Sequence, residues 1–268
     1  MSFRVQFTIT DAEYEELKRQ AVAENFPNLA EMCKAKSLGK NSYAELYREM
    51  VKKITRLGVG IEFYLRDIIP TPPALLGRWL FDAVENGRIS GVKHLGNDGT
   101  NPERYKKMGK IIATYAGCGK TTFAGMCGEI AIDLHCVPYK YFCNERDNRG
   151  ELGKADPISE MQPDWPYNYV SAVENALSRH EYILIPSDFR VLALLAEKQH
   201  SYTLVFPQRE CREEYLQRYT DRGNTENFLS IFYGNWDWFI DKLEANSYGK
   251  HIVLQPHQFL SDVIEIKK

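Results

Sequence analysis

The residues from Ala116 to Thr122 carry the clearest chemistry in the sequence, because a glycine-rich stretch there runs directly into Lys-Thr-Thr. An apolar run at residues 110–115 precedes it and predicts a buried strand, and a helical pattern follows. Glycine lets successive backbone N–H groups turn toward one phosphate, and the start of a helix adds partial positive charge. The segment therefore predicts a phosphate-binding loop made of Ala116, Gly117, Cys118, Gly119, Lys120, Thr121 and Thr122.

In loops of this type the lysine reaches the β- and γ-phosphates of a nucleoside triphosphate, and the following hydroxyl binds Mg²⁺. We expect Lys120 and Thr121 to take these roles, with ATP and Mg²⁺ as cofactors. The usual pattern, G-x-x-x-x-G-K-[ST], has glycine where this chain has Thr114. Nucleotide binding is thus expected, while catalytic competence depends on how Thr114 is accommodated. The alternative is a glycine-rich turn with an unrelated Lys-Thr pair.

Two aspartates stand at the ends of apolar runs, where a carboxylate faces the ligand crevice of a parallel sheet. Asp133 ends Ala-Ile-Asp, and Asp188 follows Ile-Leu-Ile-Pro-Ser. Carboxylate oxygens are ligands that Mg²⁺ prefers, but either residue could equally cap the next helix. We expect Asp188 to cap a helix and support the metal indirectly, and Asp133 to face the phosphoryl acceptor.

Basic and aromatic side chains suggest where the substrate lies. Arg218 and Arg222 are four residues apart, so they share one face of a predicted helix over 209–222 and could both hold the transferred phosphate from a moving lid. Arg209 and Arg212 fit an ion-paired surface instead. In Pro-Asp-Trp-Pro-Tyr-Asn-Tyr, the rings and amide of Trp165, Asn168 and Tyr169 could hold a base, or they could form a packed loop.

From Gly109 onward, apolar runs alternate with amphipathic helices, which indicates a parallel sheet flanked by helices. We therefore predict an α/β P-loop domain over residues 109–268. Its expected strands are 110–115, 131–134, 182–186, 202–206 and 251–254. Its expected helices are 121–129, 168–178, 188–198, 209–222, 226–244 and 256–262.

A small, mostly helical region precedes this domain. Residues 1–40 predict a strand over 3–10, a helix capped by Thr10 or Asp11, and a second helix capped by Asn28. Residues 41–108 predict a winged-helix-like unit. Its expected helices are 43–57 and 74–85, its expected strands are 63–65 and part of 89–95, and residues 97–102 form a turn at a wing or hairpin tip.

The glycine-rich loop, together with P-D-W-P-Y-N-Y, Y-I-L-I-P-S-D and R-Y-T-D-R-G-N, resembles the nucleoside monophosphate kinases, particularly the small P-loop nucleotide kinases of phages and prophages. The resemblance covers about residues 109–254. It implies transfer of the γ-phosphoryl group of ATP to a ribo- or deoxynucleoside monophosphate. Lys120 and Thr121 would serve the donor, and Arg218 and Arg222 the transferring phosphate.

Residues 3–38 resemble a ribbon-helix-helix DNA-binding unit in their strand-helix-helix order. That resemblance implies a homodimer whose paired strands enter the major groove, with Arg4, Gln6 and Thr8 facing the bases. The alternative is an edge strand and two helices that only dock or dimerise. A DNA-binding regulator whose P-loop domain senses nucleotide therefore competes with the kinase. An ATPase acting on nucleic acid is disfavoured, because no Asp-Glu pair ends a predicted strand.

Charge and cysteine content set broader limits. Residues 1–108 hold 17 Lys/Arg against 14 Asp/Glu, and residues 109–268 hold 17 against 22, so a modest positive excess permits but does not require DNA contact. The six cysteines show no metal-ligand spacing; Cys136 and Cys143 fit free thiols better. Without a run of roughly 18 apolar residues or a signal peptide, we expect a cytoplasmic protein with no membrane partner.

Overall fold

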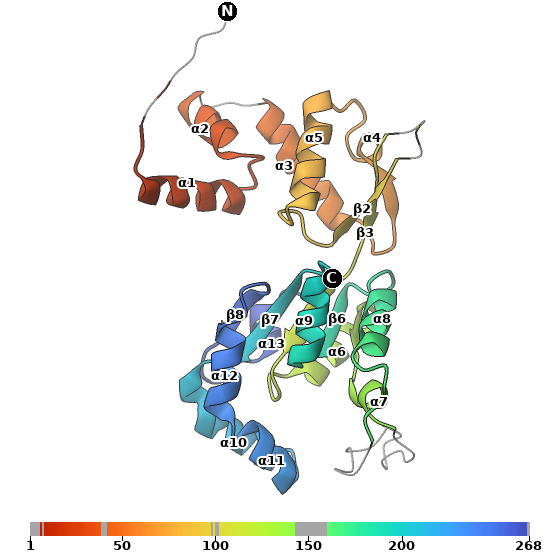
Figure 1. Cartoon of the computed structure of the whole chain (residues 1–268). Helices are drawn as coiled ribbons and strands as arrows, with labels where there is room; N and C mark the ends of the chain where they lie inside the picture. The colour runs from red at the N-terminus through yellow and green to blue at the C-terminus, as the bar shows by residue number, and fades with distance from the viewer. Residues whose placement is uncertain are drawn as a thin grey trace, which may run out of the picture. The chain divides into compact units, whose positions relative to one another are not determined.

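The chain divides between Lys107 and Met108 into two units, Met1–Lys107 and Met108–Lys268. A computed structural model describes residues 6, 8–38, 42–97, 99, 102–142 and 160–266. Figure 1 labels the helices and strands along the chain. Because each unit buries its own apolar clusters, the units are described separately.

The second unit is built on a parallel sheet of five strands in the order β5-β6-β4-β7-β8. Figure 1 labels β6, β7 and β8 of this sheet. β4 lies at the centre, between β6 and β7. The strands are β4 (Lys110–Thr114), β5 (Ala131–Asp133), β6 (Tyr182–Pro186), β7 (Tyr202–Pro207) and β8 (Lys250–Leu254). The predicted α/β class, a parallel sheet flanked by helices, is confirmed.

Continuous apolar runs make the central strands, as expected when helices cover both faces of a parallel sheet. Ile111 to Thr114 of β4 and Tyr182 to Ile185 of β6 are all buried. Ile112 pairs in register with Leu184 on one side and Thr203 on the other. Because parallel strands end at the same edge, the loops after β4, β5 and β6 meet there.

Most predicted helices of this unit form within a few residues of their expected ends. The helices are α6 (Lys120–Cys127), η1 (Gly128–Ile130), α7 (Val137–Lys140), α8 (Tyr167–Ala176), α9 (Phe189–Glu197), η2 (Arg209–Cys211), α10 (Arg212–Asp221), α11 (Glu226–Phe232), α12 (Trp236–Glu244) and α13 (Leu260–Val263). The short helix α7 was not predicted, and α13 is shorter than the predicted helix over 256–262.

The single helix predicted over 226–244 is wrong, because the chain breaks between α11 and α12. Asn235 donates side-chain hydrogen bonds of 3.1 and 3.0 Å to the carbonyls of Ser230 and Ile231, which satisfies the end of α11. At Gly234 a Cβ would lie 2.4 Å from the Ser230 carbonyl oxygen, so the turn requires glycine. The apolar periodicity continues across the break, which explains why it suggests one helix.

The first unit combines helices with a three-stranded antiparallel sheet in the order β1-β3-β2. Its elements are α1 (Asp11–Ala23), α2 (Leu29–Leu38), α3 (Ser42–Arg56), β1 (Glu62–Tyr64), α4 (Leu65–Ile68), α5 (Ala74–Glu85), β2 (Val92–Gly96) and β3 (Arg104–Lys107). The helix predicted over 74–85 is confirmed, and β2 and β3 pair on either side of the turn predicted at 97–102.

Capping residues predicted from the sequence start the first two helices. Thr10 forms a capping box with Glu13 at the start of α1, and the Asn28 side chain accepts a 2.9 Å hydrogen bond from the amide of Glu31 at the start of α2. The strand predicted over 3–10 falls mainly outside the described residues. Residues 6 and 8–10, which are described, form no strand.

Candidate functional site

The glycine-rich loop connects the end of β4 to the start of α6. Gly117 and Gly119 have φ angles of +84° and +89°, a backbone region that glycine enters at no steric cost. A Cβ at Gly117 would lie 3.0 Å from the ring of Tyr219. The shape of the loop and its packing therefore both require glycine at position 117.

Thr114 stands where the usual pattern has glycine, and the structure accommodates its side chain. Thr114 is the last residue of β4, pairs with Pro186 and Val205, and is buried. Its carbonyl accepts a 3.0 Å hydrogen bond from the amide of Ser187. Any L-residue can adopt this extended, strand-paired conformation, so Thr114 does not by itself distort the loop.

Backbone donors gather where the loop meets α6. The first N–H groups of a helix have no partner inside it, and Gly119, the N-cap, has no side chain to satisfy them. Within the stretches that the structure describes, the amides of Gly117 and Gly119 donate no backbone hydrogen bond either. Unsatisfied donors at the positive end of a helix suit a phosphate group.

Lys120 and Thr121, the first residues of α6, both bind Asp133 at the end of β5. The Lys120 ammonium forms an ion pair with Oδ1 of Asp133, and the Thr121 hydroxyl donates a 2.8 Å hydrogen bond to Oδ2. Nε2 of His135 lies 3.6 Å from the same oxygen. Asp133, which we expected to face the acceptor, thus lies beside the predicted phosphate loop.

Asp188, at the end of β6, has two partners of its own. Its Oδ1 accepts a 3.0 Å hydrogen bond from the amide of Arg190, which confirms the predicted helix cap. Its Oδ2 accepts a 2.8 Å hydrogen bond from Lys140. Burial lowers the pKa of Lys140, but the bond to Asp188 and the negative charge of Asp188, with smaller effects of Tyr141 and Cys136, together outweigh it, and the pKa rises above its ordinary value. Asp133, not Asp188, is the carboxylate bonded to Thr121.

Cys136 is close to both lysine–aspartate pairs. Burial raises the pKa of its thiol, and the charges of Lys140, Asp188 and Lys120 act on it as well. The two ion pairs themselves lie at neighbouring strands: Asp133 ends β5, and Asp188 follows β6, which pairs with β5.

Trp165 and Tyr169, predicted to stack on a base, lie in the core instead. Their exposed fractions are 6% and 0%, and their rings are 5.6 Å apart. Asn168 donates a 2.7 Å hydrogen bond to the carbonyl of Tyr139, and its oxygen accepts one of 2.7 Å from the amide of Tyr169. Their placement matches the packed-loop alternative, and the exposed ring of this segment is Tyr167.

The two arginines expected on one helix face differ in their surroundings. Arg218 is largely buried and donates 3.1 Å hydrogen bonds to the carbonyls of Gly117 and Gln258. Arg222 is exposed. Tyr215 and Tyr219, on the same helix, are almost completely buried in the core. A helix anchored in this way does not match the moving lid that we expected from α10.

The residues expected to contact DNA lie at the N-terminus. Arg4 is outside the described residues. Gln6 and Thr8 are exposed.

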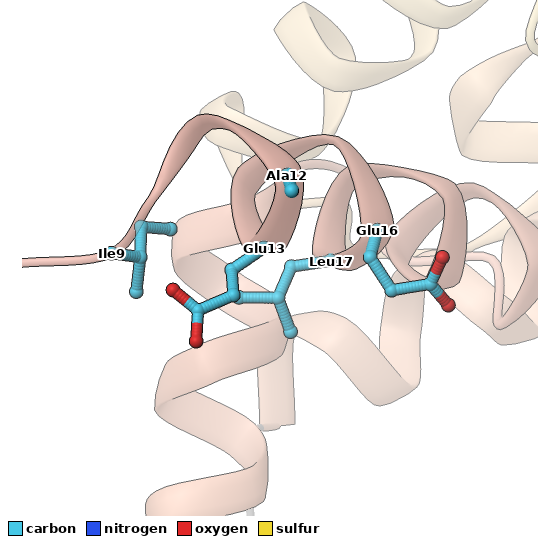
Figure 2. Close-up of a pocket in the computed structure, with 5 residues that line it drawn as sticks. All are labelled: Ile9, Ala12, Glu13, Glu16 and Leu17. Atoms are coloured by element: carbon cyan, nitrogen blue, oxygen red, sulfur yellow. The ribbon is translucent and has the colours of Figure 1, made fainter.

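A shallow apolar hollow adjoins this segment on α1, lined by Ile9, Ala12, Glu13, Glu16 and Leu17 (Figure 2). The carboxylates of Glu13 and Glu16 project from the helix around the hollow. Negative charge at this position disfavours phosphate. The hollow is therefore poorly suited to a phosphate-bearing ligand.

Among the described residues, no group of three or more His, Cys, Asp or Glu side chains is placed to hold a metal ion. No described helix is both long enough and apolar enough to cross a bilayer. Cys143, considered with Cys136 as a ligand pair, lies outside the described residues.

No family model, curated protein or solved structure matches this chain. What the site can do therefore follows from its own geometry.

Three residues of the site were not singled out in the sequence. Lys140 belongs to a four-residue helix that no periodicity indicates, and its partner Asp188 is 48 positions away. Glu214 and Phe259 both lie behind the glycine-rich loop: Glu214 bonds to Arg218, and a Cβ at Gly119 would lie 3.1 Å from the ring of Phe259. Glu214 and Phe259 can be recognised only from the tertiary structure, in which α10 and the C-terminal turn pack against the glycine-rich loop.

Proposed function

We propose that the second unit binds a nucleoside triphosphate and transfers its terminal phosphoryl group to a small phosphorylated acceptor, most simply a nucleoside monophosphate. One observation carries the proposal. At the carboxyl end of the central strand, unsatisfied amides, the ammonium of Lys120 and the hydroxyl of Thr121 come together at the start of one helix. These are the donors that a polyphosphate chain requires.

The ion pair of Lys120 with Asp133 suits a site that exchanges partners. Asp133 neutralises the ammonium of Lys120, and a triphosphate would replace it as the partner of Lys120. The Thr121 hydroxyl and the Asp133 carboxylate supply oxygen ligands of the kind that Mg²⁺ prefers. Mg²⁺, when bound there, would neutralise charge on the phosphates. We therefore assign to Asp133 the metal-supporting role first expected of Asp188.

The second ion pair supports an anionic acceptor. Asp188 follows β6, the strand beside β5, and pairs with Lys140, the last residue of α7. Phosphoryl transfer depends mainly on positioning and charge neutralisation. Two lysine–aspartate pairs, one at each of two neighbouring strands, would serve a reaction in which two phosphate-bearing molecules meet. The choice of a nucleoside monophosphate rests on the family resemblance of the sequence.

The test is ADP release from Mg-ATP, measured across a panel of ribo- and deoxynucleoside monophosphates and duplex DNA. We expect ADP release to require one acceptor and to be at least roughly 100-fold slower in Lys120→Ala. A loss of this size is typical of removing one preorganised donor. Lys198→Ala is the matched control, because Lys198 forms an exposed ion pair with Glu174. ATP binding without turnover on any acceptor would exclude the kinase.

A second candidate, a nucleotide-sensing DNA-binding regulator, is favoured by one surface of the first unit. Lys93 pairs in register with Lys106, and Gly96 with Arg104, so three basic side chains share one face of the β2–β3 hairpin. Two other basic residues of the unit do not add to this face: Arg88 bonds to the carbonyl of Pro27, and Lys107 is buried.

The two candidates separate in a DNA-binding measurement. A regulator should bind duplex DNA with an affinity that changes on adding ATP, and Lys93→Glu combined with Lys106→Glu should weaken that binding and its salt dependence. A kinase without a DNA role should show neither effect.

A further inference from the structure

Three consecutive carbonyls of the glycine-rich loop are held from behind by distant parts of the second unit. The carbonyl of Ala116 accepts a 3.1 Å hydrogen bond from the hydroxyl of Tyr219. That of Gly117 accepts one of 3.1 Å from Arg218, and that of Cys118 accepts one of 2.9 Å from the amide of Leu260. The donors come from α10 and from the turn that leads into α13.

Holding a carbonyl also orients the next amide, because the C=O and N–H of a trans peptide point in opposite directions. The bond to the Ala116 carbonyl therefore directs the N–H group of Gly117 away from Tyr219, and the bond to the Cys118 carbonyl directs that of Gly119 away from Leu260. These two amides donate no backbone hydrogen bond within the described part of the chain. The phosphate-facing side of the loop is thus set by contacts made on its opposite side.

Arg218 is the most constrained of the three donors. Its guanidinium lies 3.9 Å from the ring centroid of Phe259 and 4.6 Å from that of Tyr215. It also donates a 3.1 Å hydrogen bond to the carbonyl of Gln258 and forms an ion pair with Glu214. With three hydrogen bonds from its guanidinium and its side chain 12% exposed, Arg218 cannot turn to a phosphate without losing these contacts.

Glu214 completes the arrangement by fixing both Arg218 and the C-terminal turn. Its two oxygens accept hydrogen bonds of 3.1 and 3.0 Å from the amide of His257. Burial alone raises the pKa of Glu214, but the His257 amide and Arg218 outweigh it, so the pKa lies below its ordinary value. The carboxylate is therefore charged when it holds the guanidinium against the loop.

We propose that Arg218 and Glu214 are positioning residues that hold the glycine-rich loop in the conformation that receives the polyphosphate tail. The inference rests on the proposed nucleotide site and deepens it. It replaces the expectation that Arg218 grips the transferred phosphate directly. The ligand class that depends on the pair is any linear polyphosphate, with or without a nucleoside.

The test is calorimetric titration of the full chain with Mg-ATP and with inorganic tripolyphosphate, without an acceptor. We expect Arg218→Ala to bind both ligands at least roughly 10-fold more weakly than wild type, Arg218→Lys to lose less, and Glu214→Gln to fall between them. Arg209→Ala is the matched control, because Arg209 only pairs with exposed acids on α12, namely Asp237, Asp241 and Glu244. Its affinity should equal that of wild type.

Thermal unfolding and circular dichroism identify any variant that is not folded at the titration temperature. If Arg218→Ala is unfolded, Arg218→Lys and Glu214→Gln decide the question. Unchanged affinity in folded variants, with or without a lower kcat, would overturn the positioning role and leave the nucleotide site standing. If wild type binds neither ATP nor tripolyphosphate, the proposed site and this inference both fail.

Discussion

The hydroxyl of Thr121 and the carboxylate of Asp133 are joined by a 2.8 Å hydrogen bond, although one begins α6 and the other ends β5. Asp133 also pairs with Lys120. One carboxylate is therefore shared by the two side chains that we propose to contact the nucleotide. This sharing makes Asp133 the most informative single residue for testing the proposed Mg²⁺ dependence.

The ratio of ATP affinity in Mg²⁺ to ATP affinity in EDTA should be roughly 10–100-fold smaller in Asp133→Asn than in wild type. Residues that orient metal ligands contribute that much to metal affinity. The measurement is ATP affinity in Mg²⁺ and in EDTA, for wild type and variant. Asp188→Asn is the comparison. If Asp188→Asn loses more of this Mg²⁺ dependence than Asp133→Asn does, the metal-supporting role belongs to Asp188.

Gly117→Ala should weaken ATP binding and destabilise the protein by about 1–3 kcal/mol, because its φ of +84° and the nearby Tyr219 ring both oppose a Cβ. Gly125→Ala on α6 is the control. A Cβ there meets nothing within 4 Å, and alanine in a helix should stabilise by up to about 1 kcal/mol. Chemical denaturation and ATP titration measure both quantities. Equal effects at the two positions would contradict this account of the loop.

Asn168→Ala should lower the free energy of unfolding by about 1–3 kcal/mol, because it removes the bonds of Asn168 to Tyr139 and to the Tyr169 amide. Asn175→Ala, exposed on the same helix, should change stability little. Neither substitution should alter the preference among bases. A changed base preference in Asn168→Ala at unchanged stability would restore its predicted role in substrate binding.

The Glu214–Arg218 pair predicts a specific pH dependence of stability. The pKa of Glu214 is lower in the folded protein than its ordinary value, so its stabilising contribution is present above about pH 4.3. It is lost as pH falls through the lower folded pKa. The difference in unfolding free energy between wild type and Glu214→Gln should therefore shrink below about pH 4.3. A difference that stays constant down to pH 2 would show that the carboxylate charge contributes nothing.

The local elements of the second unit were predictable because their signals are local. The runs around Ile112 and Ile183 identify buried strands, and Asp188 caps α9 as its position after an apolar run suggests. The helix break at Gly234 was missed, because side-chain capping by Asn235 leaves no mark on apolar periodicity. The aromatic segment was misjudged for a related reason: its composition does not tell whether Trp165 and Tyr169 face a ligand or the core.

The order of residue types along the chain determined the glycine-rich loop, its flanking strand and helix, and the α/β class of the second unit, because each depends on neighbours within one turn or one strand. Three interactions were decided by the tertiary structure alone. They are the hydrogen bond of Thr121 to Asp133, the ion pair of Asp188 with Lys140, and the position of Arg218 behind the glycine-rich loop. Those pairings join residues between 12 and 101 positions apart. The order of strands in the sheet, which no local pattern encodes, brings them together.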